Sequence, residues 1–227
     1  MNYIDVNFKL LKKNIKNIIS ENNLVIKKIK IIAVSKNQNV DIIKKAILSG
    51  INNFGENYVQ ESIVKIKELK KYTNITWHFI GKIQSNKTKI IAQYFDWCQT
   101  IDQEKTAILL NQHRPKNFIP INVLIQINIS KELNKNGVNN VEDCYELAEK
   151  ISLMPHLNLR GIMAMPEIQK DFTKNENQYK KIKIIFNKLK KKYTSIDTLS
   201  LGTSDDIKES LLATSNMIRI GRNIFHK

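Results

Sequence analysis

The stretch KIKIIAVSKNQNV, residues 28–40, decides how the chain folds. Its apolar run is typical of a buried β-strand, and the run ends abruptly at Ser35 and Lys36. A helical pattern, VDIIKKAILSG, begins shortly afterwards, with Gly50 at its expected C-terminal cap. A buried strand that leads into a helix is one unit of a parallel α/β fold. The lysine at the junction is either the first solvated residue of a loop or an amine held where chemistry happens.

The same alternation of strand and helix continues along the chain. Helical spacing of apolar residues predicts helices over 6–20, 40–50, 58–71, 87–94, 103–112, 141–153, 174–192 and 205–214. Apolar runs predict strands over 30–35, 52–56, 75–81, 96–102, 120–128, 157–165, 197–203 and 217–225. Such units fit a single (β/α)8 TIM barrel, an α/β fold, in one domain over residues 1–227. The alternative is an open doubly wound sheet, although no Gly-x-Gly-x-x-Gly follows the first strand.

The charge balance raises the question of an anionic partner. Lys and Arg number 37 against 21 Asp and Glu, which gives a formal net charge of +16. Taken alone, this excess suggests nucleic acid or an anionic membrane. The lysines are spread over the whole chain, however, with apolar residues between them, as on solvated helix faces. We expect no nucleic-acid or membrane partner; a salt-dependent shift with DNA or RNA would support the alternative.

The cysteines and the N-terminus bear on the cellular compartment. Cys98 and Cys144 lack CxxC spacing, so we expect two reduced, buried thiols. The N-terminus shows no apolar core of signal-peptide length. The longest nearly uncharged run, 117–130, is interrupted by Asn and Gln and is too short to span a bilayer. These features predict a cytoplasmic protein. The four histidines are scattered, without HExxH spacing, so no metal site is predicted.

In a barrel, functional side chains lie at the carboxyl ends of the strands. The predicted strand ends carry Lys36, Glu56, Asn57, His78, Gly81, Asp102, Asn128, Met163, Met165, Gly202, Thr203, Ser204, Arg219, Gly221 and Arg222. Gly202 allows close backbone approach, and Ser204 supplies a hydroxyl at an expected helix N-cap. Loops after strands seven and eight often hold a phosphate in this fold. A lysine across the barrel mouth from a phosphate suggests pyridoxal 5′-phosphate (PLP), whose aldehyde forms a Schiff base with an amine. The alternatives are a solvated lysine and an ordinary helix cap.

Six motifs strengthen this interpretation. They are AVSK, FGENYVQE, WHFIGKIQSNK, LRGIMAMP, LSLGTSDD and MIRIGRNIF, in this order between about residues 30 and 225. Together they resemble the YggS/PROSC family of PLP-binding, or PLP homeostasis, proteins. The resemblance implies a (β/α)8 barrel similar to the N-terminal domain of alanine racemase, with PLP bound to Lys36 as a Schiff base. By motif position it implies Asn57 and His78 along the cofactor pocket, Met163 near the ring, Arg219 facing the pyridine nitrogen, and Ser204, Gly221 and Arg222 at the phosphate.

The chain departs from the family pattern at three positions. Thr203 stands where the family often has Met, Arg222 where it often has Thr or Ser, and His226 where Gly is usual. Without a hydroxyl at 222, one side-chain contact to the phosphate is lost. The backbone N–H of Arg222 remains, and its guanidinium could replace the hydroxyl if it bends inward.

The implied place of Arg219 favours binding over catalysis. Arginine stays protonated and has no acceptor lone pair, so it would leave the ring nitrogen unprotonated and the ring a poorer electron sink. Racemisation needs a base on each face of the substrate carbon. In alanine racemases the second base resembles a tyrosine that arrives through a second domain and a partner subunit, and we expect neither here. We therefore expect a monomeric, non-catalytic PLP carrier or buffer with PLP-dependent apo-enzymes as candidate recipients; the alternative is a weak PLP-dependent amino-acid racemase or lyase.

Overall fold

The computed structural model describes residues 2–26, 28–130, 132, 135–167 and 172–226. The strands are β1 (Lys30–Val34), β2 (Asn53–Glu56), β3 (Thr76–Phe79), β4 (Trp97–Ile101), β5 (Ile121–Ile127), β6 (Leu157–Ala164), β7 (Thr198–Ser200) and β8 (Met217–Ile220). The helices are α1 (Tyr3–Glu21), α2 (Val40–Leu48), α3 (Val59–Glu68), the short 3-10 helix η1 (Ser85–Lys87), α4 (Thr88–Tyr94), α5 (Glu104–His113), α6 (Val141–Ser152), α7 (Phe172–Lys192), α8 (Ile207–Leu212) and α9 (Arg222–Phe225).

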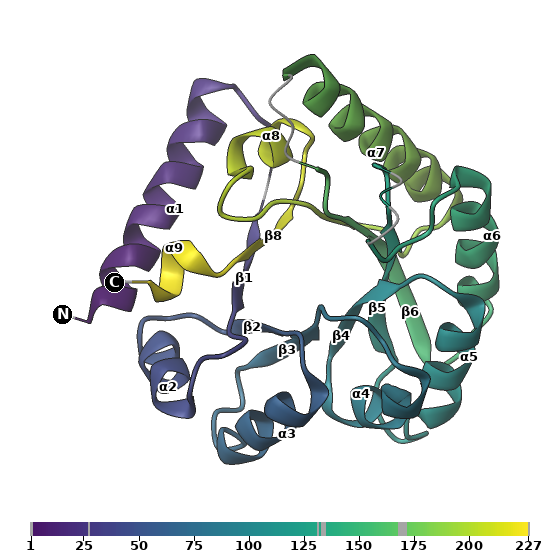
Figure 1. The fold of residues 1–227 in the computed structure, drawn as a ribbon, viewed down its shortest axis with the longest axis horizontal. Helices are drawn as coiled ribbons and strands as arrows, with labels where there is room; N and C mark the ends of the chain where they lie inside the picture. The colour runs from purple at the N-terminus through teal and green to yellow at the C-terminus, as the bar shows by residue number, and fades with distance from the viewer. Residues whose placement is uncertain (1, 27, 131, 133–134, 168–171, 227) are drawn as a thin grey trace.

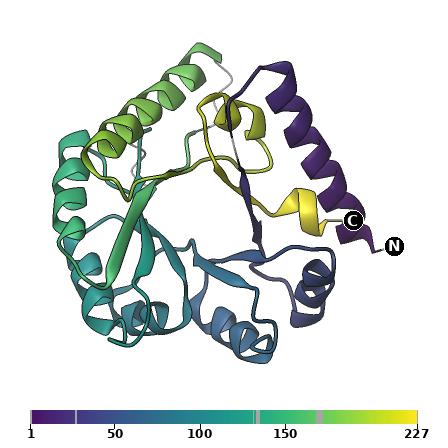
Figure 2. The ribbon, with the colours of Figure 1, turned by 180° about the vertical axis from the view of Figure 1, so that it is seen from behind.

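The strands of the described residues form one closed barrel in sequence order. All neighbouring pairs are parallel, and β1 closes the barrel against β8, with Ile32 opposite Arg219. The helices form an outer ring around the strands in both views (Figures 1 and 2). The predicted (β/α)8 barrel is therefore confirmed, and the alternative of an open sheet is wrong.

The buried apolar side chains form two separate clusters. A large cluster lies between the strands and the helices, as expected for strands that are buried on both sides. A small separate cluster consists of Ile32, Trp97, Leu124, Met163 and Met217, contributed by five different strands. We assign it to the inside of the barrel, where side chains from different strands stack in layers. The interior is thus a packed core, and ligands must bind at its end.

The C-terminal segment differs from the prediction. The strand expected over 217–225 ends at Ile220, and α9 follows. Ile224 and Phe225 are buried, which explains the apolar pattern, but they pack against α1 (Figure 1). The Tyr3 hydroxyl donates to the Phe225 carbonyl at 3.2 Å, and the Asn7 amide donates to the Ile224 carbonyl at 3.2 Å. The helix before the first strand therefore completes the ring beside the short α8.

The helices of the described residues differ from membrane-spanning helices in length or in composition. Not one of them combines the length and the apolar character that crossing a membrane requires.

Candidate functional site

Four of the predicted site residues follow four neighbouring strands. Ser204 follows β7, Gly221 follows β8, Lys36 follows β1 and Asn57 follows β2. Because these strands are adjacent in the closed barrel, the four loops lie side by side at its carboxyl end. A Cβ built on Gly221 would lie 3.6 Å from the Cβ of Val34, the last residue of β1. The structure thus brings the predicted lysine next to the predicted phosphate loops.

Lys36 lies in a tight turn directly after β1, and its side chain is exposed. The turn is closed by a hydrogen bond of 3.0 Å from the Gln38 N–H to the Ser35 carbonyl. Asn37 adopts a left-handed conformation with φ of 62°, which asparagine tolerates better than most residues. The amine is therefore accessible to solvent and to a ligand, while the backbone that carries it has a defined shape.

The loop after β7 is shaped by Gly202 and Asp206. Gly202 has φ of 105°, so β7 cannot continue to Thr203 as the sequence predicted. The backbone N–H and the hydroxyl of Thr203 both donate to Asp206 Oδ1 at 2.7 Å. Asp206 directly precedes α8, so the prediction of Ser204 as the helix N-cap is wrong. The Ser204 hydroxyl instead accepts the Asn223 N–H at 3.5 Å and links the loops after β7 and β8.

Two hydroxyl groups donate hydrogen bonds to the second carboxylate oxygen of Asp206. Tyr179 on α7 donates to Asp206 Oδ2 at 2.7 Å, and Ser210 donates to it at 3.1 Å. Burial and the neighbouring Asp206 carboxylate raise the pKa of the Tyr179 hydroxyl, so this hydroxyl stays protonated and donates. The sequence showed no signal for this role of Tyr179, because α7 and the loop meet only in the folded barrel.

The Arg222 side chain is engaged at the protein surface. Its guanidinium forms an ion pair with Asp205 on the surface, and 59% of its side chain is exposed. The guanidinium is thus engaged by a carboxylate of the neighbouring loop. The backbone N–H of Arg222 remains next to Gly221 at the mouth.

Arg219 lies deeper, on β8, and is almost fully buried. It donates to the Ser200 hydroxyl at 2.6 Å, to the Ser200 carbonyl at 3.0 Å and to the Ala164 carbonyl at 3.0 Å. Burial lowers its pKa to about 10, with the Asp206 charge acting in the opposite direction, so it stays protonated at neutral pH. Three of its five N–H donors are used in these bonds, which leaves two for a ligand.

The hydrogen bonds continue from Ser200 across the barrel. The Ser200 hydroxyl donates to Gln99 Oε1 at 2.8 Å, and Gln99 Nε2 lies 3.0 Å from His78 Nδ1. His78 Nε2 lies 3.1 Å from Asn53 Oδ1. The amide oxygens of Gln99 and Asn53 can only accept, so they receive their hydrogen bonds from the Ser200 hydroxyl and from His78 Nε2. His78 Nδ1 then accepts from Gln99 Nε2, and His78 carries its proton on Nε2.

His78 therefore lies inside the barrel and not at its rim. Its ring is fully buried and stacks on Trp97 with 5.4 Å between the ring centroids. Burial holds its pKa well below the usual value, so the ring is neutral at physiological pH. Met163 belongs to the same interior layer as Trp97. Both predicted residues therefore lie among the side chains inside the barrel.

The other strand-end candidates have roles within the fold. Glu56 is fully buried and pairs with Lys65 of α3. Asn128 donates to the Glu132 carbonyl at 2.8 Å and so holds the loop after β5. Gly81 packs on the backbone of β2's end, where a Cβ would come within 2.1 Å of a carbonyl oxygen.

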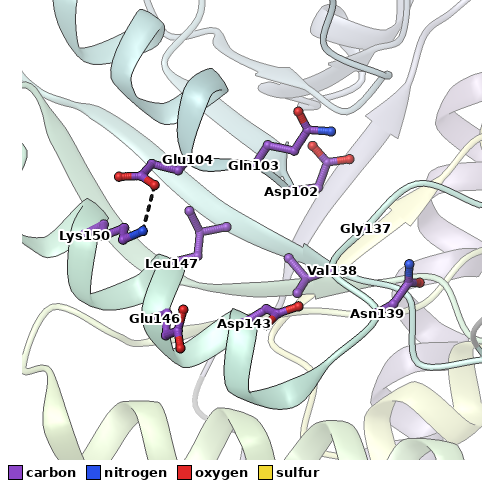
Figure 3. A pocket seen from close by; sticks show the side chains of 10 residues that line it. All are labelled: Asp102, Gln103, Glu104, Gly137, Val138, Asn139, Asp143, Glu146, Leu147 and Lys150. Atoms are coloured by element: carbon purple, nitrogen blue, oxygen red, sulfur yellow. Dashed lines mark hydrogen bonds and ion pairs between the residues drawn. The ribbon is translucent and has the colours of Figure 1, made fainter.

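A surface hollow of about 370 Å³ lies to one side, between α5 and α6 (Figure 3). The candidate Asp102 is one of its lining residues, with Asp143 and Glu146 on the α6 side, and Lys150 is paired with Glu104 at 2.7 Å. Carboxylates of this density repel a phosphate. The hollow is therefore a poor site for an anionic ligand.

The residues at the mouth fit PLP. The buried Asn57 Oδ1 has no hydrogen-bond partner among the described residues, and a buried acceptor without a donor is costly unless a ligand supplies one. The same end of the barrel offers an exposed amine, hydroxyls, backbone N–H groups and the free donors of a buried guanidinium. These groups match the aldehyde, the phosphate and the pyridine nitrogen of the cofactor.

Known proteins agree with this assignment. The family model described as the alanine racemase N-terminal domain matches residues 6–226. The pyridoxal phosphate homeostasis protein of Buchnera aphidicola subsp. Schizaphis graminum is 64% identical over 225 residues, which cover 99% of this chain and 98% of that protein. The protein of the same name from Escherichia coli is 44% identical over 199 residues, covering 87% and 85%. The structure of Synechococcus elongatus PipY with PLP bound has a TM-score of 0.80 at 26% identity, and the match covers 93% of this chain and 99% of PipY.

These matches cover 85% or more of both partners, and the names of the Buchnera and Escherichia coli proteins refer to pyridoxal phosphate. The chain therefore belongs to the YggS/PROSC family of pyridoxal phosphate homeostasis proteins, which share the barrel of the alanine racemase N-terminal domain.

Proposed function

We propose that this chain is a single-domain carrier or buffer that binds PLP at the barrel mouth through a Schiff base on Lys36. The observation that carries the proposal is the position of Lys36, exposed and one strand away from the Gly221 loop. The names of the relatives and the PLP-bound PipY structure support it. Two buried, unpaired cysteines agree with a reducing cytoplasm. PLP-dependent apo-enzymes are the proposed recipients, and we propose that the protein acts as a monomer.

Each residue has a proposed task in holding the cofactor. Ser204 and the backbone N–H groups around Gly221 bind the phosphate, and Arg222 contributes its backbone. Asn57 Oδ1 accepts a hydrogen bond from the bound molecule. Arg219 donates to the pyridine nitrogen. Met163 and His78 close the pocket from beneath.

The same residues limit catalysis. Bound PLP supplies an electron sink for amino-acid carbanions, and this sink is strongest when its ring nitrogen is protonated. Arg219 has donors only, so it keeps that nitrogen unprotonated. His78 is a poor base, because it is buried and both of its ring nitrogens are hydrogen-bonded. Tyr58, which directly precedes α3, is 55% exposed, and we do not propose it as the second base that racemisation needs.

The cofactor site is tested by ultraviolet–visible spectroscopy of the purified protein before and after borohydride reduction, followed by peptide mapping. We expect a yellow protein whose reduced adduct maps to Lys36. Lys36→Ala should lose the adduct and keep its thermal unfolding midpoint, because the side chain is exposed. Lys45→Ala, which changes an exposed lysine on α2, is the matched control and should keep the adduct. A protein that stays colourless with added PLP, or an adduct elsewhere, would refute the proposal.

A weak racemase is the second candidate, since the chain matches the alanine racemase N-terminal domain. Chiral chromatography after incubation with single enantiomers distinguishes the two. We expect no conversion above that of free PLP. Turnover that disappears in Lys36→Ala would favour the racemase.

A further inference from the structure

The turn that carries Lys36 rests on a buried ionic cluster, which we call the α3 brace: Glu56, Glu61 and Lys65. Lys65 Nζ lies 2.9 Å from Glu56 Oε1 and 2.5 Å from Glu61 Oε1. The Lys65 and Glu56 side chains are 4% and 0% exposed, so Lys65 differs from Lys67, which is exposed on the same helix. Burial raises the pKa of Glu56, against the effect of Ser35 and Lys65.

The brace contacts the turn on both sides of Lys36. On one side, the Ser35 hydroxyl donates to Glu56 Oε1 at 2.5 Å, and Lys65 Nζ donates to the Ser35 carbonyl at 2.7 Å. On the other side, the Asn37 N–H donates to Glu61 Oε1 at 2.7 Å. The residue before Lys36 and the residue after it are thus both held by one cluster, and Lys36 itself is left free.

Stability alone is a weak reason for such a cluster. Replacing a buried ion pair by apolar residues is often neutral or stabilising, because burial of charges is costly. Ionic groups do provide directional bonds to main-chain groups, which apolar side chains cannot. The bonds from the brace to the turn are therefore its distinctive feature.

We propose that Glu56, Glu61 and Lys65 are positioning residues that hold the 35–37 turn so that the Lys36 amine faces the barrel mouth, and that they set how fast Lys36 captures and releases PLP. This inference rests on the proposed function. In the capture step the Lys36 amine adds to the aldehyde carbon, a C=N bond replaces the C=O bond, and water leaves; release is the reverse. If the turn changed between several conformations, the Lys36 amine would approach the aldehyde in a reactive geometry less often. Capture would then be slower.

The main test is Glu61→Ala, which removes the acceptor for the Asn37 N–H at a side chain that is 28% exposed. Glu61→Gln keeps an amide oxygen at that place and should restore the bond. Glu68→Ala, an exposed change on the same helix, is the control. The double variant Glu56→Gln/Lys65→Met removes the buried pair, and the Glu61 charge that it leaves without Lys65 belongs to a side chain that is 28% exposed.

Two measurements are made on each variant. Amide hydrogen exchange of residues 35–38 in the PLP-free protein reports the turn, and the absorbance change on mixing with PLP reports capture. We expect Glu61→Ala and the double variant to exchange faster and to capture PLP about 5–50-fold more slowly, in line with the cost of misplacing a reacting group. Glu61→Gln and Glu68→Ala should match the wild type in both.

The outcomes separate this inference from the proposed function. Faster exchange with unchanged capture would overturn the positioning role and leave the cofactor site intact. Unchanged exchange in Glu61→Ala would show that the brace does not hold the turn. If wild-type protein forms no adduct at Lys36, the proposed function fails and the inference fails with it.

Discussion

Arg219 on β8 donates a hydrogen bond of 2.6 Å to the Ser200 hydroxyl on β7. This bond starts the buried chain that runs through Gln99 and His78 to Asn53. Amide oxygens only accept and amide nitrogens only donate, so Gln99 and Asn53 set the direction of the bonds along this network. This hydrogen-bond network holds Arg219 against one wall of the barrel. It also keeps carboxylates from direct contact with the N–H groups of Arg219 that are already bonded.

We expect Ser200→Ala to destabilise the protein by about 1–3 kcal/mol, since it leaves a buried guanidinium donor and the Gln99 oxygen without their partner. Urea denaturation followed by circular dichroism gives the free energy of unfolding. Ser204→Ala, at the mouth, is the control and should change it by less than about 0.5 kcal/mol. Equal changes in the free energy of unfolding for the two variants would show that the buried hydrogen-bond network adds no specific stability.

The fold could be predicted from the sequence because its signals are local. Each strand and helix shows its own spacing of apolar residues, and the alternation of the two implies the parallel barrel. The rule that barrel sites lie at strand ends then indicated Lys36, Ser204 and Gly221 without any structure. The same local signal gave a wrong prediction after β8, where the strand was expected to continue to residue 225. Ile224 and Phe225 are buried in a helix, and burial alone does not distinguish a helix from a strand.

The supporting residues could not be predicted from local signals. Gln99 and Ser200 are 101 positions apart in the chain, and Tyr179 and Asp206 are 27 apart. Nothing in the local sequence distinguishes the buried Lys65 from the exposed Lys67 of the same helix. Such pairs are set by barrel closure and by which helix face turns inward, and neither is visible in a single short window.

His78 should make stability depend on pH in the mildly acidic range. Its pKa is lowered in the folded protein, so below the unfolded value of about 6.5 only the unfolded chain takes up the proton. Stability is therefore lost as the pH falls, by about 2 kcal/mol between about pH 7.5 and about pH 5. Urea denaturation at the two pH values should show this loss in wild type, and it should be smaller in His78→Gln. Parallel losses in both proteins would assign the pH dependence to other groups.

The cysteines should be inert in the folded protein. Burial raises the pKa of both Cys98 and Cys144 to about 12, so the reactive thiolate is rare at neutral pH. We expect Ellman's reagent to react at least about 1,000-fold more slowly with the native protein than with the urea-unfolded protein at about pH 8. The unfolded chain should then release two equivalents, one for each cysteine. Rapid reaction of the native protein would mean that a thiol is accessible.

The family usually has a Thr or Ser hydroxyl at position 222, and this chain has Arg222. Either its guanidinium or its backbone N–H alone then contacts the phosphate. The side chain is paired with Asp205 at the surface, so we expect the backbone N–H to supply the phosphate contact. Arg222→Ala, which removes the guanidinium without adding a hydroxyl, should then change the Kd for PLP by less than about threefold, the range of an exposed ion pair. A loss of tenfold or more in Arg222→Ala, with an unchanged unfolding midpoint, would show that the guanidinium leaves Asp205 and binds the phosphate. Asp205→Asn distinguishes the two further when it is made with and without Arg222→Ala. A tightening of PLP binding at low salt that disappears in the double variant requires the released guanidinium, because the loss of the Asp205 charge is common to both proteins.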